Sequence, residues 1–252
     1  MLLGKRIASA TACLFIALAG SALAQQPPAK APTAKTTGPL AAHLSQSANP
    51  HVYPYAYLLS TSVWSTRKIF VCWDNPDPTF AAEMKLVQDA VTESWEKYSA
   101  LTFVGWGKCA AVNAGIRITI SDEGPYTRGL GKNLQTGKGT QSGGMVLNFV
   151  FNNWSPSCQA AAMRTMCIRS IAMHEFGHAI GFAHEQNRPD KPGECLKPSQ
   201  GQDGDKLLTP YDKESIMNYC FDIYQTGIGL SKLDVSAVRQ IYGSEDDKLA
   251  MK

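Results

Sequence analysis

Three histidines and a glutamate lie close together in the segment HEFGHAIGFAH, residues 174–184. His174 and His178 are four residues apart, so on a helix both imidazoles project from the same face and can reach one ion. Glu175 follows His174 at about 100° around such a helix. It is then close enough to touch a water molecule bound to that ion without being a ligand itself. The spacing therefore predicts a metal site with a carboxylate beside it.

The residues after the second histidine predict how a third ligand arrives. Gly181 can adopt a positive φ, which would end the helix and turn the chain so that His184 comes back toward the ion. Three protein ligands leave a fourth position open, which is typical of a catalytic zinc site rather than a structural one. The five fixed positions of HExxHxxGxxH arise by chance with a probability on the order of 10⁻⁵ in a chain of this composition.

The chemistry that follows from these residues is hydrolysis. One bound Zn²⁺ would polarise a scissile carbonyl and lower the pKa of a bound water toward about 7. Glu175 would take the proton as the water attacks and deliver it to the leaving amine. The residues thus predict a catalytic zinc site that activates water for hydrolysis.

The longer pattern resembles the zinc signature of the metzincin clan, and the Glu185 that follows the third histidine resembles the astacin family in particular. Arg188 and Asp190 are similar to the astacin continuation beyond the helix. Residues 211–219, YDKESIMNY, resemble that family's Met-turn region, YDxxSIMxY. The chain departs from the family at Lys191-Pro192, where Arg-Asp is usual, and at Asn218, where histidine is usual.

The resemblance implies roles for further residues. Met217 would form an apolar floor beneath the zinc without coordinating it. Tyr219 would alternate between binding the metal, as a further ligand, and stabilising the oxyanion. Glu185 would be structural and receive the processed N-terminus through a water-mediated contact, and Gly181 would be structural as well.

The fold implied by the resemblance is α+β. It is a zincin-like metalloprotease fold with an N-terminal mixed β-sheet, two long helices, and a smaller irregular C-terminal subdomain that carries the Met-turn and a final helix. The residue patterns agree with it. They predict strands at 68–73, 101–106, 115–121 and 143–151, helices at 79–98, 160–178 and 231–242, and loops at 124–144 and 187–210. Ser231 and Asp234 are spaced as a capping box for the final helix.

The N-terminal region is expected to be an export signal followed by a spacer. Lys5 and Arg6 precede an apolar run that ends in an A-x-A pattern, which predicts a signal peptide at 1–24 with cleavage after Ala24. Residues 25–63 are rich in proline and alanine and read as a disordered spacer or short pro-segment. The catalytic domain is expected at 64–243, with a tail at 244–252.

Latency in metzincins often relies on a cysteine or an aspartate in the pro-segment. The stretch 25–66 contains no cysteine, aspartate or glutamate, so only His43 or His51 could offer a strong zinc ligand there. We therefore expect no cysteine-based or aspartate-based latency from this segment.

Six cysteines remain after removal of the predicted signal, and an even set in an exported protein favours disulfides. Fifteen pairings are possible. Proximity in the sequence favours Cys158–Cys167 and Cys195–Cys220, which leaves Cys72–Cys109. We expect the protein to be secreted or periplasmic.

The composition excludes some classes of binding partner. The net charge of +3, with 18% charged residues and no basic cluster, argues against nucleic acid. No segment predicts stable membrane insertion, and we expect a monomer that acts on a protein or peptide. Two alternatives to an exported endopeptidase remain open. One is a cell-wall peptide hydrolase or amidase with the same zinc site, and the other is an inactive metal-binding adhesion module, which would have no need of Glu175.

Overall fold

The computed structural model describes residues 56–110, 115–136, 144–221 and 229–250. The expected signal peptide and most of the expected spacer, including His43 and His51, lie outside these residues. The strands are β1 (Tyr57–Leu58), β2 (Lys68–Trp73), β3 (Thr102–Lys108), β4 (Ile116–Ile120), β5 (Tyr126–Thr127), β6 (Met145–Leu147) and β7 (Lys206–Leu207). The helices are α1 (Ala81–Val91), α2 (Ala161–Ala179), α3 (Lys232–Tyr242) and α4 (Glu245–Ala250).

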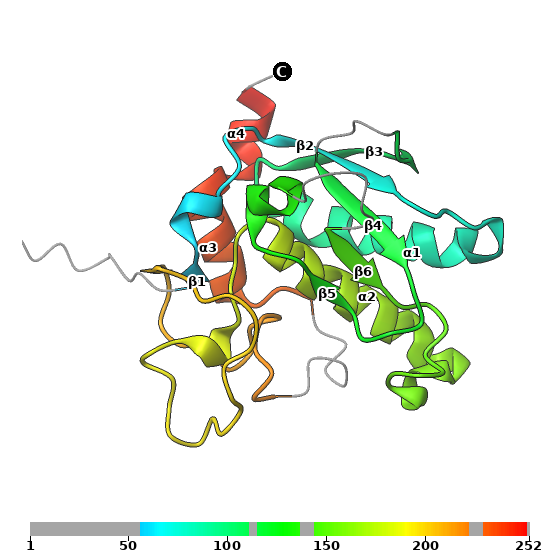
Figure 1. Ribbon diagram of the computed structural model, residues 1–252. Coiled ribbons are helices and arrows are strands. Elements are labelled where there is room, and N and C mark those ends of the chain that lie inside the picture. Colours follow the sequence, from blue (N-terminus) through cyan, green and yellow to red (C-terminus); the bar gives the residue numbers. More distant parts are fainter. Residues whose placement is uncertain (1–55, 111–114, 137–143, 222–228, 251–252) are drawn as a thin grey trace, which may run out of the picture. The chain divides into compact units, whose positions relative to one another are not determined.

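A five-stranded sheet forms one layer of the domain, with strand order β3-β2-β4-β6-β5 (Figure 1). β2, β3, β4 and β6 run parallel, and β5 pairs with β6 in the antiparallel direction. β5 is therefore an edge strand. The expected mixed sheet within an α+β fold is confirmed.

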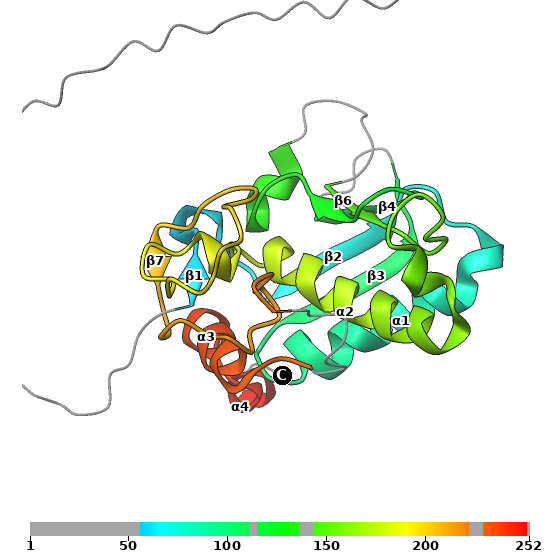
Figure 2. The ribbon, with the colours of Figure 1, turned by 90° about the horizontal axis from the view of Figure 1, so that it is seen from below.

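Helices α1 and α2 lie side by side on the same face of this sheet (Figure 2). On β2, Ile69 and Val71 alternate along the strand and are buried in the same hydrophobic core as residues of both helices. Phe176 of α2 meets Phe103 of β3 edge-on, with ring centroids 5.2 Å apart. The helix that carries the predicted metal ligands is thus anchored through its apolar side to the sheet.

The two predicted long helices are present. Helix α1 continues through a π-helical turn at Thr92–Glu96, so the helical run ends close to the predicted position. Trp95 in this turn is fully buried, and its indole N–H donates to Met173 O on α2 at 2.8 Å. This bond ties the two helices together one residue before the first histidine.

The strand predicted at 143–151 is shorter than expected, because β6 ends at Leu147. Asn148 Oδ1 accepts hydrogen bonds from Val150 N–H and Phe151 N–H, both at 2.8 Å. An asparagine that bonds the backbone two and three residues ahead bends the chain out of the sheet. Alternating apolar residues alone do not reveal this turn.

The predicted loops contain short elements that sequence patterns missed. The loop at 124–144 includes β5 and a 3₁₀ turn at Gly131–Thr136, and its residues 137–143 lie outside the described chain. The loop at 187–210 includes β7, and the tail at 244–252 includes α4. Strands of two residues are too short for periodicity to indicate them.

The chain enters the fold a few residues before Trp64. β1 pairs antiparallel with β7, and Leu58 also pairs with Phe182 in the turn that precedes the third histidine. Leu59 N–H donates to Gly181 O at 3.0 Å. The segment before Trp64 therefore supports the predicted metal site directly.

Three disulfides join described residues, and they match the expected pairs. They are Cys72–Cys109, Cys158–Cys167 and Cys195–Cys220. Within the described residues, no helix combines the length and apolar character needed to cross a membrane.

Candidate metal centre

The chain turns after the end of α2, as predicted from Gly181. Gly181 has φ +109°, a conformation that favours glycine, and its N–H donates to His178 O at 2.9 Å. A Cβ at this position would lie 3.1 Å from Ser62 Oγ and 3.2 Å from Leu58 Cδ1. The turn then carries the chain back to His184.

The three histidines converge on one point. His184 Nε2 lies 3.2 Å from His174 Nε2 and 3.1 Å from His178 Nε2, and all three residues are buried. Three nitrogens on a tetrahedral Zn²⁺ with Zn–N bonds of 2.0–2.1 Å would be about 3.3 Å apart. The spacing of the ligand atoms thus suits a single zinc ion.

Backbone carbonyls fix the orientation of each ring. The Nδ1 atoms of His174, His178 and His184 lie 2.7, 2.7 and 2.9 Å from the carbonyl oxygens of Ile216, Phe182 and Gln200. Each Nδ1 must carry the proton to donate to a carbonyl, so each Nε2 presents a lone pair to the shared point. Three lone pairs facing one another cannot bond among themselves, and a cation satisfies all three.

The electrostatics of the site also suit a metal. Burial lowers the pKa of His174 to about 3, with His184 adding to the shift, so the imidazole is neutral as a metal ligand must be. Burial raises the pKa of Glu175 to about 8, and a nearby cation would favour the carboxylate form instead. Glu175 Oε2 has no hydrogen-bond partner among the described residues.

The Met-turn contacts the chain at both ends of the ligand set, at His174 on α2 and at Glu185 directly after His184. Ile216 supplies the carbonyl for His174, and Met217 O accepts from Glu185 N–H at 2.9 Å. The Met217 side chain is buried under the helix and lies where a side chain at Gly177 would be, since a Cβ there would be 2.3 Å from Met217 Sδ. These contacts agree with an apolar floor at Met217.

Tyr219 lies against the histidines. Its ring stacks on His174, with centroids 4.7 Å apart, and is 4.8 Å from the His184 ring. Its N–H donates to Gln186 Oε1 at 3.1 Å, and Gln186 is fully buried with no partner for Nε2 among the described residues. Gln186 was not indicated by the motif, because the motif leaves that position free.

Glu185 is held by two groups of the chain itself. Its carboxylate accepts from Asp212 N–H at 2.8 Å and lies 3.3 Å from the buried guanidinium of Arg188. Burial raises the pKa of Glu185, and Arg188 and the Asp212 N–H oppose that shift. The contact with a processed N-terminus stays a prediction.

The predicted capping box of Ser231 and Asp234 at the start of α3 is confirmed. Asp234 also has a second role. Its carboxylate also accepts from Ser215 Oγ at 2.7 Å and from Ile216 N–H at 3.0 Å. Asp234 therefore anchors the residue whose carbonyl orients His174. The capping pattern could be read in the sequence, whereas the contact with the Met-turn depends on tertiary structure.

Burial raises the pKa of Asp234 from its ordinary value of 3.8 to about 6, with the neighbouring Asp212 adding to the shift. Between these pH values the folded protein holds a proton that the unfolded chain has released. The stability that this group contributes is thus fully present below pH 3.8 and is lost as the pH rises to about 6.

We expect the zinc-loaded wild type to lose about 2 kcal/mol more stability between pH 4 and pH 6 than Asp234→Asn, which cannot titrate. Urea unfolding of both proteins at a series of pH values measures the two slopes. Parallel profiles would show that Asp234 does not titrate in this range.

An open cleft lies over the histidines. Its floor includes Glu175, His178, His184 and Tyr219, one wall comes from the β5 region at 125–130, and Gln200, Gly201 and Gln202 line it as well. Both predicted loops, 124–144 and 187–210, therefore border the site.

Comparison with known proteins relates the segment that carries the histidines to one family. The model of the astacin family, peptidase family M12A, matches residues 155–196, which include α2 and all three histidines. Bone morphogenetic protein 1 of Xenopus laevis is 34% identical over 104 residues, which cover 34% of this chain and 15% of that protein. In the segment that carries the histidines, the chain resembles the astacin family of metzincins.

Further similarities are narrower in scope. High choriolytic enzyme 1 of Oryzias latipes is 37% identical over 70 residues, which cover 23% of this astacin-like chain and 26% of that protein. The chain thus spans about a quarter or less of the length of these curated relatives. The solved structure of myroilysin shares the fold, with a TM-score of 0.51 and 18% identity over 74% of this chain and 98% of that one.

Proposed function

We propose that this protein is an exported zinc-dependent endopeptidase. The observation that carries the proposal is the position of Glu175, a buried carboxylate on the floor of an open cleft beside three convergent imidazoles. A site that only binds metal has no need of such a carboxylate. The three disulfides among the described residues suit an exported protein.

His174, His178 and His184 would hold the ion. Bound zinc supplies Lewis-acid chemistry, which polarises the scissile carbonyl and makes water easier to deprotonate. Glu175 would accept the proton of the attacking water on its carboxylate and return it to the leaving amine. Tyr219, whose ring lies against two of the ligands, would donate its hydroxyl hydrogen to the oxyanion.

The edge strand β5 supports an extended substrate. Tyr126 and Thr127 line the cleft, and β5 pairs with β6 along one side only. A peptide can add to such an edge through backbone hydrogen bonds, with its scissile bond over the metal. An open cleft admits the middle of a chain as well as its ends, so we infer an endopeptidase and not an exopeptidase.

The test is digestion of a peptide library by the protein without its signal segment. We expect cleavage at internal bonds, loss of cleavage when a chelator removes zinc, and recovery when zinc is added back. Cleavage of purified cell wall without cleavage of peptides would favour the amidase alternative. Zinc binding without either activity would favour the adhesion module.

A further inference from the structure

The third ligand differs from the other two in how its ring is oriented. His178 donates to a carbonyl four residues further along, and His174 donates to the anchored Met-turn. His184 instead donates to Gln200 O, at 2.9 Å, in a long irregular segment between η6 (Glu185–Asn187) and β7. A carbonyl in such a segment can orient a ligand only if another group holds it in place.

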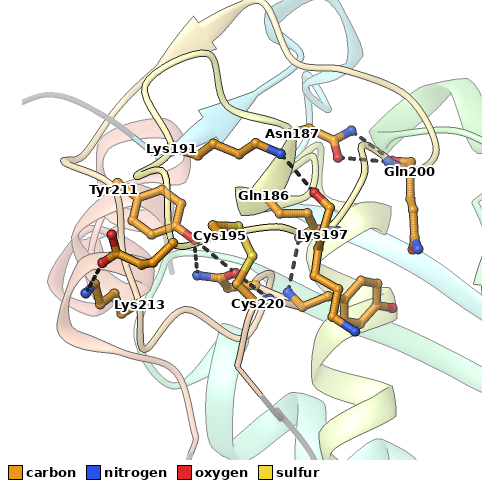
Figure 3. The surroundings of a disulfide bond; sticks show 12 residues. Gln186, Asn187, Lys191, Cys195, Lys197, Gln200, Tyr211, Lys213 and Cys220 are labelled. Atoms are coloured by element: carbon orange, nitrogen blue, oxygen red, sulfur yellow. Dashed lines mark hydrogen bonds and ion pairs between the residues drawn. A yellow bond between two sulfur atoms is a disulfide. The ribbon is translucent and has the colours of Figure 1, made fainter.

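Asn187 provides that group. Its Oδ1 accepts from Gln200 N–H at 2.9 Å, and its Nδ2 donates to Gln200 O at 2.8 Å (Figure 3). The second Nδ2 hydrogen is donated to Asp203 Oδ1 at 2.8 Å. The side-chain amide of Asn187 thus hydrogen-bonds both the N–H and the C=O of Gln200, and both of its own N–H hydrogens are donated.

The pair of hydrogen bonds from the Asn187 side chain to the Gln200 backbone, here called the clamp, is held in place by its surroundings. Asn187 is only 9% exposed and its own N–H donates to His184 O at 3.1 Å, so its backbone is fixed to the ligand residue. Beyond Gln200 the chain turns at Gly201, which has φ +67°. The Cys195–Cys220 bridge ties the middle of the segment to the residue after Tyr219.

We propose that Asn187 is a positioning residue of the zinc site. By clamping the Gln200 backbone it fixes the carbonyl that sets the tautomer and orientation of His184. The proposal rests on the zinc-dependent function proposed above. Its primary readout is metal affinity, so it can fail or succeed separately from peptide cleavage.

The experiment compares Asn187→Ala and Asn187→Asp with wild type, using the full chain without its signal segment. Partners outside the ligand set of a metal site commonly change affinity 10–100-fold, and Asn187 acts through one intervening carbonyl. We therefore expect the zinc dissociation constant to rise about tenfold in Asn187→Ala, as measured by competition with a chelator. The visible spectrum of the Co²⁺-substituted protein should change as well, because the third imidazole is less well oriented.

Asn187→Asp separates the two halves of the clamp. Aspartate still accepts from Gln200 N–H but sets a second carboxylate oxygen against Gln200 O and Asp203. We expect it to weaken zinc binding at least as much as alanine does. If Asn187→Ala does not fold, Asn187→Asp alone carries the measurement.

The chain offers a matched control in Asn75. Its Nδ2 donates to Ile120 O at 2.9 Å and its Oδ1 accepts from Ile120 N–H at 2.8 Å, which is the same two-sided clamp at the end of β4. Neither residue lines the cleft. Asn75→Ala should lower the melting temperature and leave zinc affinity within about twofold of wild type.

The proposal is overturned if Asn187→Ala, like Asn75→Ala, loses only thermal stability and binds zinc as tightly as wild type with an unchanged Co²⁺ spectrum. If wild type binds zinc but cleaves no peptide, the proposed function fails and the affinity comparison still decides the role of Asn187.

Discussion

Replacing Glu175 with alanine or glutamine should lower kcat/KM for peptide cleavage by roughly 10²–10⁴-fold, the contribution typical of a general base. Neither side chain can take a proton from water at neutral pH. Zinc should stay bound at one ion per chain, because Glu175 is not among the convergent nitrogens. Peptide kinetics together with metal analysis of the purified variants measure both effects.

The control for this experiment is Glu93→Gln, which removes a surface carboxylate paired with Arg169 and leaves the cleft intact. It should retain wild-type kinetics. Wild-type turnover by Glu175→Gln would contradict the assigned role of the carboxylate. Loss of zinc from that variant would mean that Glu175 acts on metal binding instead.

Replacing Arg188 with alanine should destabilise the domain by about 3–5 kcal/mol, the usual cost of removing one partner from a buried ion pair. The guanidinium is fully buried. It lies 3.3 Å from Glu185, bonds Asp190 through two nitrogens, and donates to Thr209 O at 3.0 Å. Its loss leaves the carboxylate of Glu185 buried without a cation. For a domain of this size we expect the melting temperature to fall by about 6–20 °C, measured by calorimetry with zinc present.

Arg169→Ala is the comparison for this result. Arg169 pairs with an exposed glutamate, and such pairs contribute less than about 1 kcal/mol. A double variant adds a further test, since Glu185→Gln removes the charge that Arg188 compensates. The two substitutions together should then cost less than the sum of each alone, and strict additivity would exclude the ion pair as the cause.

The zinc ligands could be predicted because their geometry is local. Two histidines four residues apart need only a helix, and the return of His184 needs only the positive φ of Gly181. Two of the disulfides could be predicted from proximity for a similar reason, and the third is the pair that remains. The long helices and the main strands carry enough residues for their period to be recognised.

The supports of the site could not be predicted, because each joins residues that are distant in the sequence. Asn187 meets Gln200, and Asp234 meets Ser215 and Ile216, only after irregular segments have taken their final path. No periodicity describes such segments. Their conformation comes from the hydrogen bonds themselves, so neither the path nor the partner can be inferred alone.

The close approach of Gly177 and Met217 has a consequence for how this protein can change over generations. The sulfur of Met217 fills the space that any larger residue at position 177 would need. A variant at either position alone meets an overfilled or underfilled core directly beneath the metal. In related lineages the two positions should therefore vary together, with any gain of volume at 177 accompanied by a smaller or differently shaped side chain at 217.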